Sequence, residues 1–393
     1  MWPERHKEER PEPEDRLPGP LFESVWQWAQ DRLRRLPYMA STPVKIALLG
    51  NGFAARVQLP ALRKVGGNEV LGIAGRDPER ARATAERFGL PRSTSDYREL
   101  LDLKPDLVIV TTPVDLHAPM VRDALEVGAA VLCEKPFAMS AAEAEPLVQA
   151  AEGRLALIDH QLRWNPYRKK LDELVRSGTL GDLWHVRVQA AWGQPQHLTR
   201  PHTWWYEKER GGGILGAGAS HLVDMLLFHF GAIDRVQGRL LTYVKERPSD
   251  DGPKAVTADE HASLWLDLAS GVRATLDTDL ILPGGPFLMM EVWGSQGVLR
   301  LENEVRLTHT PHGGEMQGIA VDPGEFADTE GEHASYGAFG RAEPMFLRDV
   351  LAAVAEGRSE LPGAATFADG LACMRVLDAA RASDEQGGWV ACS

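Results

Sequence analysis

Cysteine is scarce in this chain of 393 residues. The three cysteines, Cys133, Cys373 and Cys392, are widely spaced, and none belongs to a C-x-x-C pair. This pattern excludes a disulfide framework and a cysteine-based zinc site, and it favours a reducing cytoplasm. No G-x-S-x-G turn occurs either, so a serine hydrolase is not indicated.

Long apolar runs and an excess of positive charge are also missing. No apolar run reaches the roughly 20 residues of a membrane span, and the N-terminus lacks the apolar stretch of a secretory signal. Lys and Arg total 43 against 56 Asp and Glu, a net charge of −13, which disfavours nucleic acid as the partner. The histidines show no ligand pair such as H-E-x-x-H, so no metal site is predicted.

Composition predicts a globular protein of two domains. Hydrophobic residues make up 44% and charged residues 25%, which permits a large core. Residues 1–42 differ from the rest, because proline and charge crowd their first half and apolar residues recur at helical spacing over 22–36. We expect these residues to form an N-terminal arm that is flexible or weakly ordered.

Residues 43–160 predict a doubly wound α/β domain of the Rossmann type. Short, continuously apolar runs alternate with helical patterns, which is typical of a parallel sheet covered on both faces. The expected strands are 44–49, 70–74, 107–110, 130–133 and 155–158. The expected helices run to about residue 64 and over about 78–88, 117–127 and 141–151.

Residues 161–393 predict an α+β domain with an open, mainly antiparallel sheet. Strand-like segments follow one another with turn residues between them, at 184–192, 236–244, 262–268, 273–281, 287–293 and 298–301. Helices are expected over 167–176, 344–356 and 365–383.

A glycine-rich turn follows the first predicted strand. The segment from Gly50 to Ala55 matches G-x-G-x-x-A between a strand and a helix, which is the dinucleotide-binding context. Gly50 permits the tight turn, Gly52 lets the backbone approach a pyrophosphate, and free N–H groups at the helix start bind the anion. A tight turn without a ligand is the alternative.

The end of the second strand bears on cofactor choice. A carboxylate there usually binds the ribose hydroxyls of NAD, but this chain has Gly75 followed by Arg76. Since an arginine can pair with a 2′-phosphate, NADP is favoured over NAD.

Two further motifs carry proton chemistry. Lys135, in Glu134-Lys135-Pro136, follows a parallel strand and so sits at the edge of the sheet where ligands bind. His221 and Asp224 lie three residues apart in an apolar helix that follows the triplet Gly211–Gly213, and a histidine there can exchange protons near neutral pH. The alternatives are a surface lysine and a buried structural histidine.

Taken in order, these motifs resemble the Gfo/Idh/MocA oxidoreductases, which include glucose–fructose oxidoreductase and inositol dehydrogenase. The resemblance runs from about Val44 to the C-terminus and includes Thr112-Pro113 followed by His117. It implies that Lys135 and His221 are catalytic and that the C-terminal sheet forms a homodimer or homotetramer. The cofactor-binding residues it implies are Gly50, Gly52, Phe53, Ala54, Ala55, Arg76, Thr111, Thr112, Pro113, His117, Glu134 and Lys135.

The predicted activity is hydride transfer between NADP or NAD and a small, sugar-like polyol or carbonyl substrate. Candidate substrate residues are Arg163, Asn165, Trp204 and Asp224, the last a possible partner for His221. Many dehydrogenases of the family carry Asp four residues before the histidine, where this chain has Ala217. That departure keeps two alternatives open, a dinucleotide-binding sensor without catalysis and a glycosidase that retains its cofactor.

Overall fold

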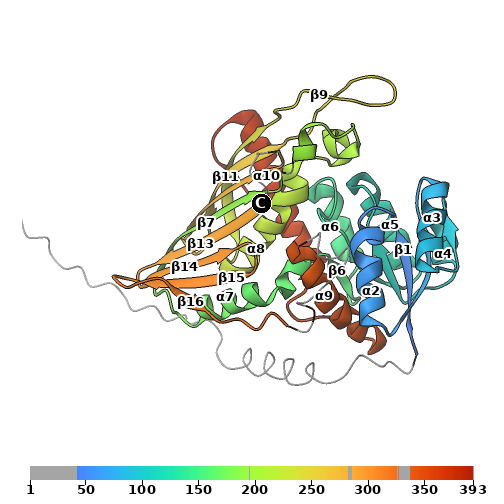
Figure 1. The fold of residues 1–393 in the computed structure, drawn as a ribbon, viewed down its shortest axis with the longest axis horizontal. Coiled ribbons are helices and arrows are strands. Elements are labelled where there is room, and N and C mark those ends of the chain that lie inside the picture. The colour runs from blue at the N-terminus through green and yellow to red at the C-terminus, as the bar shows by residue number, and fades with distance from the viewer. Residues whose placement is uncertain (1–41, 194, 282–285, 325, 327–336, 393) are drawn as a thin grey trace, which may run out of the picture. The chain divides into compact units, whose positions relative to one another are not determined.

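The computed structural model describes residues 42–193, 195–281, 286–324, 326 and 337–392, so the predicted arm lies outside the described residues except for Thr42. Within these ranges the strands form a seven-stranded sheet, here sheet A, a nine-stranded sheet, here sheet B, and a two-stranded ribbon. Sheet A carries the labels β1 and β6 in Figure 1, and sheet B the labels β7, β11 and β13–β16.

Sheet A is the predicted parallel sheet. Its order is β17-β6-β5-β4-β1-β2-β3, and only the short β17 (Ala365–Thr366) runs antiparallel to its neighbour among the described pairs. The strands from the first half of the chain are β1 (Val44–Leu49), β2 (Asn68–Ala74), β3 (Ser93–Thr94), β4 (Leu107–Val110), β5 (Ala130–Cys133) and β6 (Ala156–Ile158). Between them lie a π-helical turn (Ala54–Gln58), α2 (Leu59–Val65), α3 (Pro78–Phe88), α4 (Arg98–Leu101), α5 (His117–Glu126) and α6 (Ala141–Ala150).

Local sequence signals set the helix ends in this sheet. The Asp77 side chain accepts a hydrogen bond of 3.1 Å from the Arg80 amide, and Pro78 occupies the first turn of α3. Gly89 ends the helix in the left-handed conformation, with φ of 59°. The Rossmann architecture predicted from the sequence is therefore confirmed, while the short β3 and α4 were not predicted.

Sheet B is mainly antiparallel, as predicted. Among its described pairs only β7 and β12 run parallel. In spatial order its strands are β16 (Gln317–Ile319), β15 (Arg306–Pro311), β14 (Gly297–Glu302), β13 (Phe287–Gly294), β7 (Leu183–Ala191), β12 (Arg273–Asp279), β11 (His261–Leu268), β8 (Ile233–Leu241) and β18 (Val390–Ala391). Burial alternates along β11, where Leu264 and Leu266 are in the core while Trp265 is 62% exposed.

The second half of the chain forms four further α-helices among the described residues: α7 (Pro166–Arg176), α8 (Ser220–Phe230), α9 (Gly337–Ala355) and α10 (Phe367–Gln386). The helix predicted to start at Pro344 begins at Gly337, with Pro344 inside it. A proline there removes one backbone hydrogen bond, and the buried Ala342 and Phe346 on either side offset that loss. α9 packs against α2, and α10 against both α6 and β8, so the end of the chain returns to sheet A.

One stretch, Lys208–Phe230, has the length and hydropathy of a membrane span. Its apolar window is 83% buried inside the fold, which is the position of a core helix. It comprises a π-helical turn (Leu215–Ala219) and α8.

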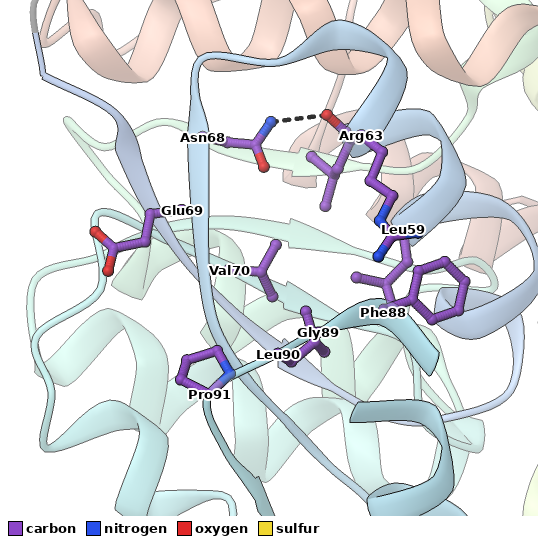
Figure 2. Close-up of a pocket in the computed structure, with 10 residues that line it drawn as sticks. Leu59, Arg63, Asn68, Glu69, Val70, Phe88, Gly89, Leu90 and Pro91 are labelled. Atoms are coloured by element: carbon purple, nitrogen blue, oxygen red, sulfur yellow. Dashed lines mark hydrogen bonds between the residues drawn. The ribbon is translucent and has the colours of Figure 1, made fainter. Parts of the chain in front are cut away.

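Figure 2 shows a hollow of about 300 Å³ lined by α2, the start of β2 and the segment after α3. Arg63 lies over the Phe88 ring at its rim, 4.7 Å from the ring centroid. A second hollow, of about 330 Å³, borders Pro105, Ala130 and Leu155. Both hollows lie at the amino ends of the parallel strands, whereas ligands of such sheets bind at the carboxyl ends. The candidate site is therefore elsewhere.

Candidate active site

The glycine turn lies at the carboxyl end of β1. Gly50 has a φ of +122°, and a Cβ there would lie 2.8 Å from the Thr112 nitrogen, so only glycine fits. A Cβ on Gly52, by contrast, would meet nothing within 4 Å. The turn is thus tight where it passes the loop after β4 and open at Gly52, where the sequence predicts a pyrophosphate.

Buried polar atoms without partners border this turn. Both amide atoms of Asn51 and the hydroxyl of Thr111 are buried and have no hydrogen-bond partner among the described residues. Thr111 adjoins the turn because its amide donates to the Leu49 carbonyl at 2.7 Å. Since buried polar groups are normally satisfied, these atoms fit a polar ligand such as a dinucleotide. Phe53, Ala54 and Ala55 continue from the turn into the π-helical turn and α2.

Arg76 lies at the end of β2, beside the glycine turn. Its neighbour Gly75 faces Asn51, since a Cβ on Gly75 would lie 3.3 Å from the Asn51 Cβ. The Arg76 side chain is exposed, so an external anion can reach its guanidinium. This placement suits a group that binds the adenosine ribose of a dinucleotide and a 2′-phosphate on it.

His117, the first residue of α5, joins two loops of the site. Its Nε2 lies 2.9 Å from the carbonyl oxygen of Thr112, which precedes Pro113, and its Nδ1 lies 3.1 Å from that of Pro136. Burial lowers the pKa of His117, so a neutral ring donates through one nitrogen at a time. Its side chain therefore holds the loop after β4 against the loop that carries Lys135.

Lys135 is the second residue after β5, and its side chain contacts the second half of the chain. Its Nζ donates a hydrogen bond of 3.0 Å to the carbonyl oxygen of Ala217. Burial lowers the pKa of Lys135, and the neighbouring Glu134 and Asp159 oppose that change. At position 217, where the family often has a carboxylate, the backbone carbonyl therefore binds the amine.

His221 lies in α8, one turn after Ala217. It is 2% exposed, its Nδ1 is 3.5 Å from Nδ1 of His160, and its ring centroid is 5.0 Å from that of Phe339. Burial holds the pKa of His221 well below its usual value, and Lys135 and His160 lower it further. A neutral imidazole therefore lies beside the lysine.

Asp224 pairs with an arginine. Its carboxylate accepts two hydrogen bonds from Arg163, of 2.6 and 3.0 Å, and lies 3.9 Å from Nε2 of His160. Although burial alone raises the pKa of Asp224, His160 and Arg163 bring it below its usual value. Asp224 therefore reaches His221 through His160, not directly.

The other candidate substrate residues have contacts that hold the fold. Asn165 caps α7 by accepting from the Tyr167 amide at 2.8 Å, and it donates to the Glu304 carbonyl at 3.1 Å. Trp204 packs on Trp205, with ring centroids 5.9 Å apart. The structure thus brings Lys135, His221 and Asp224 together and gives Arg163, Asn165 and Trp204 structural partners.

Sequence reasoning missed several residues of the site. Asp159 and His160 follow β6 directly, and the carboxyl end of a parallel strand is a signal that would have found them. Glu343 comes from α9, far along the chain, and no local pattern marks it. The described residues contain no group of three or more His, Cys, Asp or Glu side chains arranged to hold a metal ion.

Comparison with known proteins agrees with this geometry. Residues 44–158 match a family model described as an oxidoreductase family with an NAD-binding Rossmann fold, and residues 169–300 match one described as a GFO/IDH/MocA C-terminal domain. An uncharacterized oxidoreductase of Synechocystis is 31% identical over 74% of this chain and 84% of its own length.

Two further similarities concern named dehydrogenases. The D-apiose dehydrogenase of Paraburkholderia graminis is 30% identical over 71% of this chain and 73% of its own length. The structure of levoglucosan dehydrogenase in complex with NADH superposes with a TM-score of 0.79 at 23% identity, covering 90% of this chain and all of that one. The last likeness establishes the fold.

Proposed function

The chain belongs to the Gfo/Idh/MocA family of oxidoreductases, and from that premise we propose that it transfers a hydride between a nicotinamide cofactor and a sugar-like polyol or carbonyl compound. The observation that carries the proposal is the position of Lys135. Lys135 lies at the carboxyl edge of sheet A, its amine donates to the Ala217 carbonyl one turn before the buried His221, and burial lowers its pKa.

The residues of the site divide the chemistry between them. When bound, the nicotinamide accepts or supplies the hydride. Lys135 binds the substrate oxygen and, as a neutral amine, takes the hydroxyl proton when the alcohol is oxidised. His221, which burial keeps neutral, exchanges that proton with its surroundings. Glu134, His117 and the glycine turn position these groups.

Replacing Lys135 with methionine tests this assignment. Lys135→Met keeps most of the length of the side chain but removes the amine, so we expect turnover to fall by about 10²- to 10⁴-fold. Cofactor affinity, measured by fluorescence titration, should change little. The control is Lys254→Met, the same change at an exposed position. Turnover that survives in Lys135→Met would contradict the assignment.

The exposed guanidinium of Arg76 supports NADP as the preferred cofactor. A charge-assisted, bidentate contact with a 2′-phosphate is worth about 1.5–3 kcal/mol, so Arg76→Ala should weaken NADP binding about 10- to 100-fold. NAD binding should be nearly unchanged. A wild-type preference for NAD by a wide margin would refute this proposal.

Related enzymes support the substrate class. The relatives named above are dehydrogenases of apiose and of levoglucosan, both carbohydrates. A panel of sugars and sugar lactones, followed by absorbance of the reduced nicotinamide, would identify the substrate. Product release without net reduction would indicate a glycosidase, and tight cofactor binding without turnover a sensor.

The outer face of sheet B supports a homo-oligomer. Trp265 is 62% exposed there, and Trp184, at the start of β7, is 61% exposed. A monomer rarely leaves such rings in water, so a second copy of this sheet is the proposed cover. We also propose that residues 43–160 act as the cofactor domain and 161–393 as the substrate and assembly domain. The three free thiols favour a cytoplasmic location.

A further inference from the structure

Three buried carboxyl groups form a cluster, and two of them interact with the Lys135 amine. They are Glu134 after β5, Asp159 after β6 and Glu343 in α9, and all three are at most 6% exposed. Asp159 interacts with both glutamates, and Glu343 also faces the amide of Gln161. Asp159 and Glu343 take no direct part in the proton transfer proposed for Lys135 and His221.

Most oxygens of this cluster lack a donor. The Asp159 Oδ2 accepts from the Gln58 amide at 2.9 Å, and the Glu134 Oε2 accepts from the Lys135 amide at 3.2 Å. Apart from the Gln161 amide that faces Glu343, the described part of the chain offers no N–H or O–H donor to the remaining oxygens of Asp159 and Glu134 or to the oxygens of Glu343. Two carboxylates cannot hydrogen-bond to each other, so these contacts require protons on the carboxyl groups.

Charge balance indicates which groups carry the protons. One ammonium, that of Lys135, faces three buried carboxyl groups, and a second ionised carboxylate would be buried without compensation. Burial raises the pKa of Asp159 only to about 6, because Gln58 and the two glutamates donate to it. Burial and the neighbouring Asp159 raise the pKa values of Glu134 and Glu343 much further.

We propose that Glu343 and Asp159 set the charge state of Lys135: protonated Glu343 donates a hydrogen bond to the Asp159 carboxylate, and that carboxylate is the negative charge facing the amine. Both are positioning residues, since they act through Lys135 and not on the substrate. The consequence for catalysis rests on the proposed role of Lys135 in proton transfer. Removing the donor at position 343 favours protonation of Asp159, which removes the charge and makes the lysine easier to deprotonate.

The histidines and the thiol around the cluster are neutral and do not substitute for this charge. His160 and His221 both interact with Lys135, and burial lowers the pKa of His160 to about 4 and that of His221 well below its usual value. The Cys133 thiol faces Glu134 and Asp159, and burial raises its pKa. Arg168 acts on His221 from α7, beyond the histidine.

The pKa of the Lys135 amine can be measured directly. The full-length chain, without cofactor, is acetylated with acetic anhydride over a range of pH, and mass spectrometry of the Lys135 peptide gives the labelling midpoint. In Glu343→Leu, which has no donor, we expect this midpoint to fall by about one pH unit, since an opposite charge nearby typically shifts a pKa by about that much or more. In Asp159→Asn it should fall by at least as much.

Three comparisons decide the outcome. Glu343→Gln keeps an N–H donor and should retain the wild-type midpoint, and the exposed Glu145→Gln is the matched control. Glu343→Leu combined with Asp159→Asn should give no larger fall than Asp159→Asn alone. A wild-type midpoint in Asp159→Asn, or equal falls in the glutamine and leucine variants at position 343, would overturn the proposal. If Glu343→Leu does not fold, as judged by circular dichroism, Asp159→Asn and Glu343→Gln still decide.

Kinetics supply the second readout. In alcohol oxidation the rising limb of kcat/KM against pH should move to lower pH in Glu343→Leu, by the same amount as the labelling midpoint. A merely structural role would lower activity at every pH without moving the limb. Because labelling needs no turnover, a wrong substrate class leaves the midpoints intact, so failure of the proposed function is distinguishable from failure of this proposal.

Discussion

Replacing Asp224 with asparagine separates a structural role from a catalytic one. In the structure Asp224 binds the guanidinium of Arg163, which is 5% exposed. The side chain of His160 lies between Asp224 and His221. Asp224→Asn keeps the shape of the side chain but removes its charge. Arg163 is then left buried with a neutral partner, which makes the folded state less stable.

The magnitude follows from the surroundings of Arg163. Removing one partner of a buried ion pair typically costs about 3–5 kcal/mol. Asp369 lies 3.7 Å from Arg163 and is 41% exposed, so it compensates part of the loss. We therefore expect a cost near the low end, about 3 kcal/mol, which lowers the melting temperature by about 6 °C at roughly 2 °C per kcal/mol.

Thermal unfolding followed by circular dichroism measures this loss. The matched control is Glu79→Gln, which neutralises a carboxylate 2.7 Å from Arg82 in a pair whose side chains are 57% and 80% exposed. That exposed pair contributes little to stability, so Glu79→Gln should melt at the wild-type temperature. If Asp224→Asn melted within a degree of the wild type while its turnover fell about 100-fold with a displaced pH profile, Asp224 would be a proton-transfer partner and the reasoning would be refuted.

Two further predictions concern the glycine turn and the outer face of sheet B. Gly50→Ala should lower the melting temperature, because its Cβ would crowd Thr112. Gly52→Ala should melt like the wild type but bind cofactor more weakly, because its Cβ enters the open space. Cofactor titrations and thermal melts of both variants check these expectations. Trp265→Glu should shift the protein towards monomer in analytical ultracentrifugation without changing cofactor affinity, and an unchanged sedimentation coefficient would show that this face is not the interface.

The sequence predicted sheet A well because its strands are buried on both faces. Apolar runs such as Leu107–Val110, and Val44–Leu49 with Lys45 as its one exposed residue, mark such strands with little ambiguity. In sheet B the strand predicted over 236–244 runs instead from Ile233 to Leu241. The amides of Tyr243 and Val244 donate to the Glu260 carboxylate at 2.9 and 2.8 Å, so these residues leave the sheet. A side-chain acceptor that distant cannot be predicted from local pattern.

In the candidate site, too, the sequence predicts the residues that a local motif marks and misses those that only tertiary packing brings in. The motif residues Gly50, Lys135 and His221 could be selected because each stands in a recognisable local context. The role of Asp224 could not, since spacing in a helix places it near His221 but does not reveal that Arg163 binds it. Glu343 lies more than two hundred residues from Lys135, and only the packing of α9 places it against Asp159.

Because the C-terminal segment returns to sheet A, neither half of the chain can simply be replaced by the corresponding half of a relative. β17 covers the edge strand β6, and α9 carries Glu343 to the carboxyl groups behind the lysine. A chimera that joined residues 43–160 to a foreign partner would expose that strand edge and open the carboxyl cluster to solvent. Point substitutions therefore disturb this fold less than a swap of whole domains.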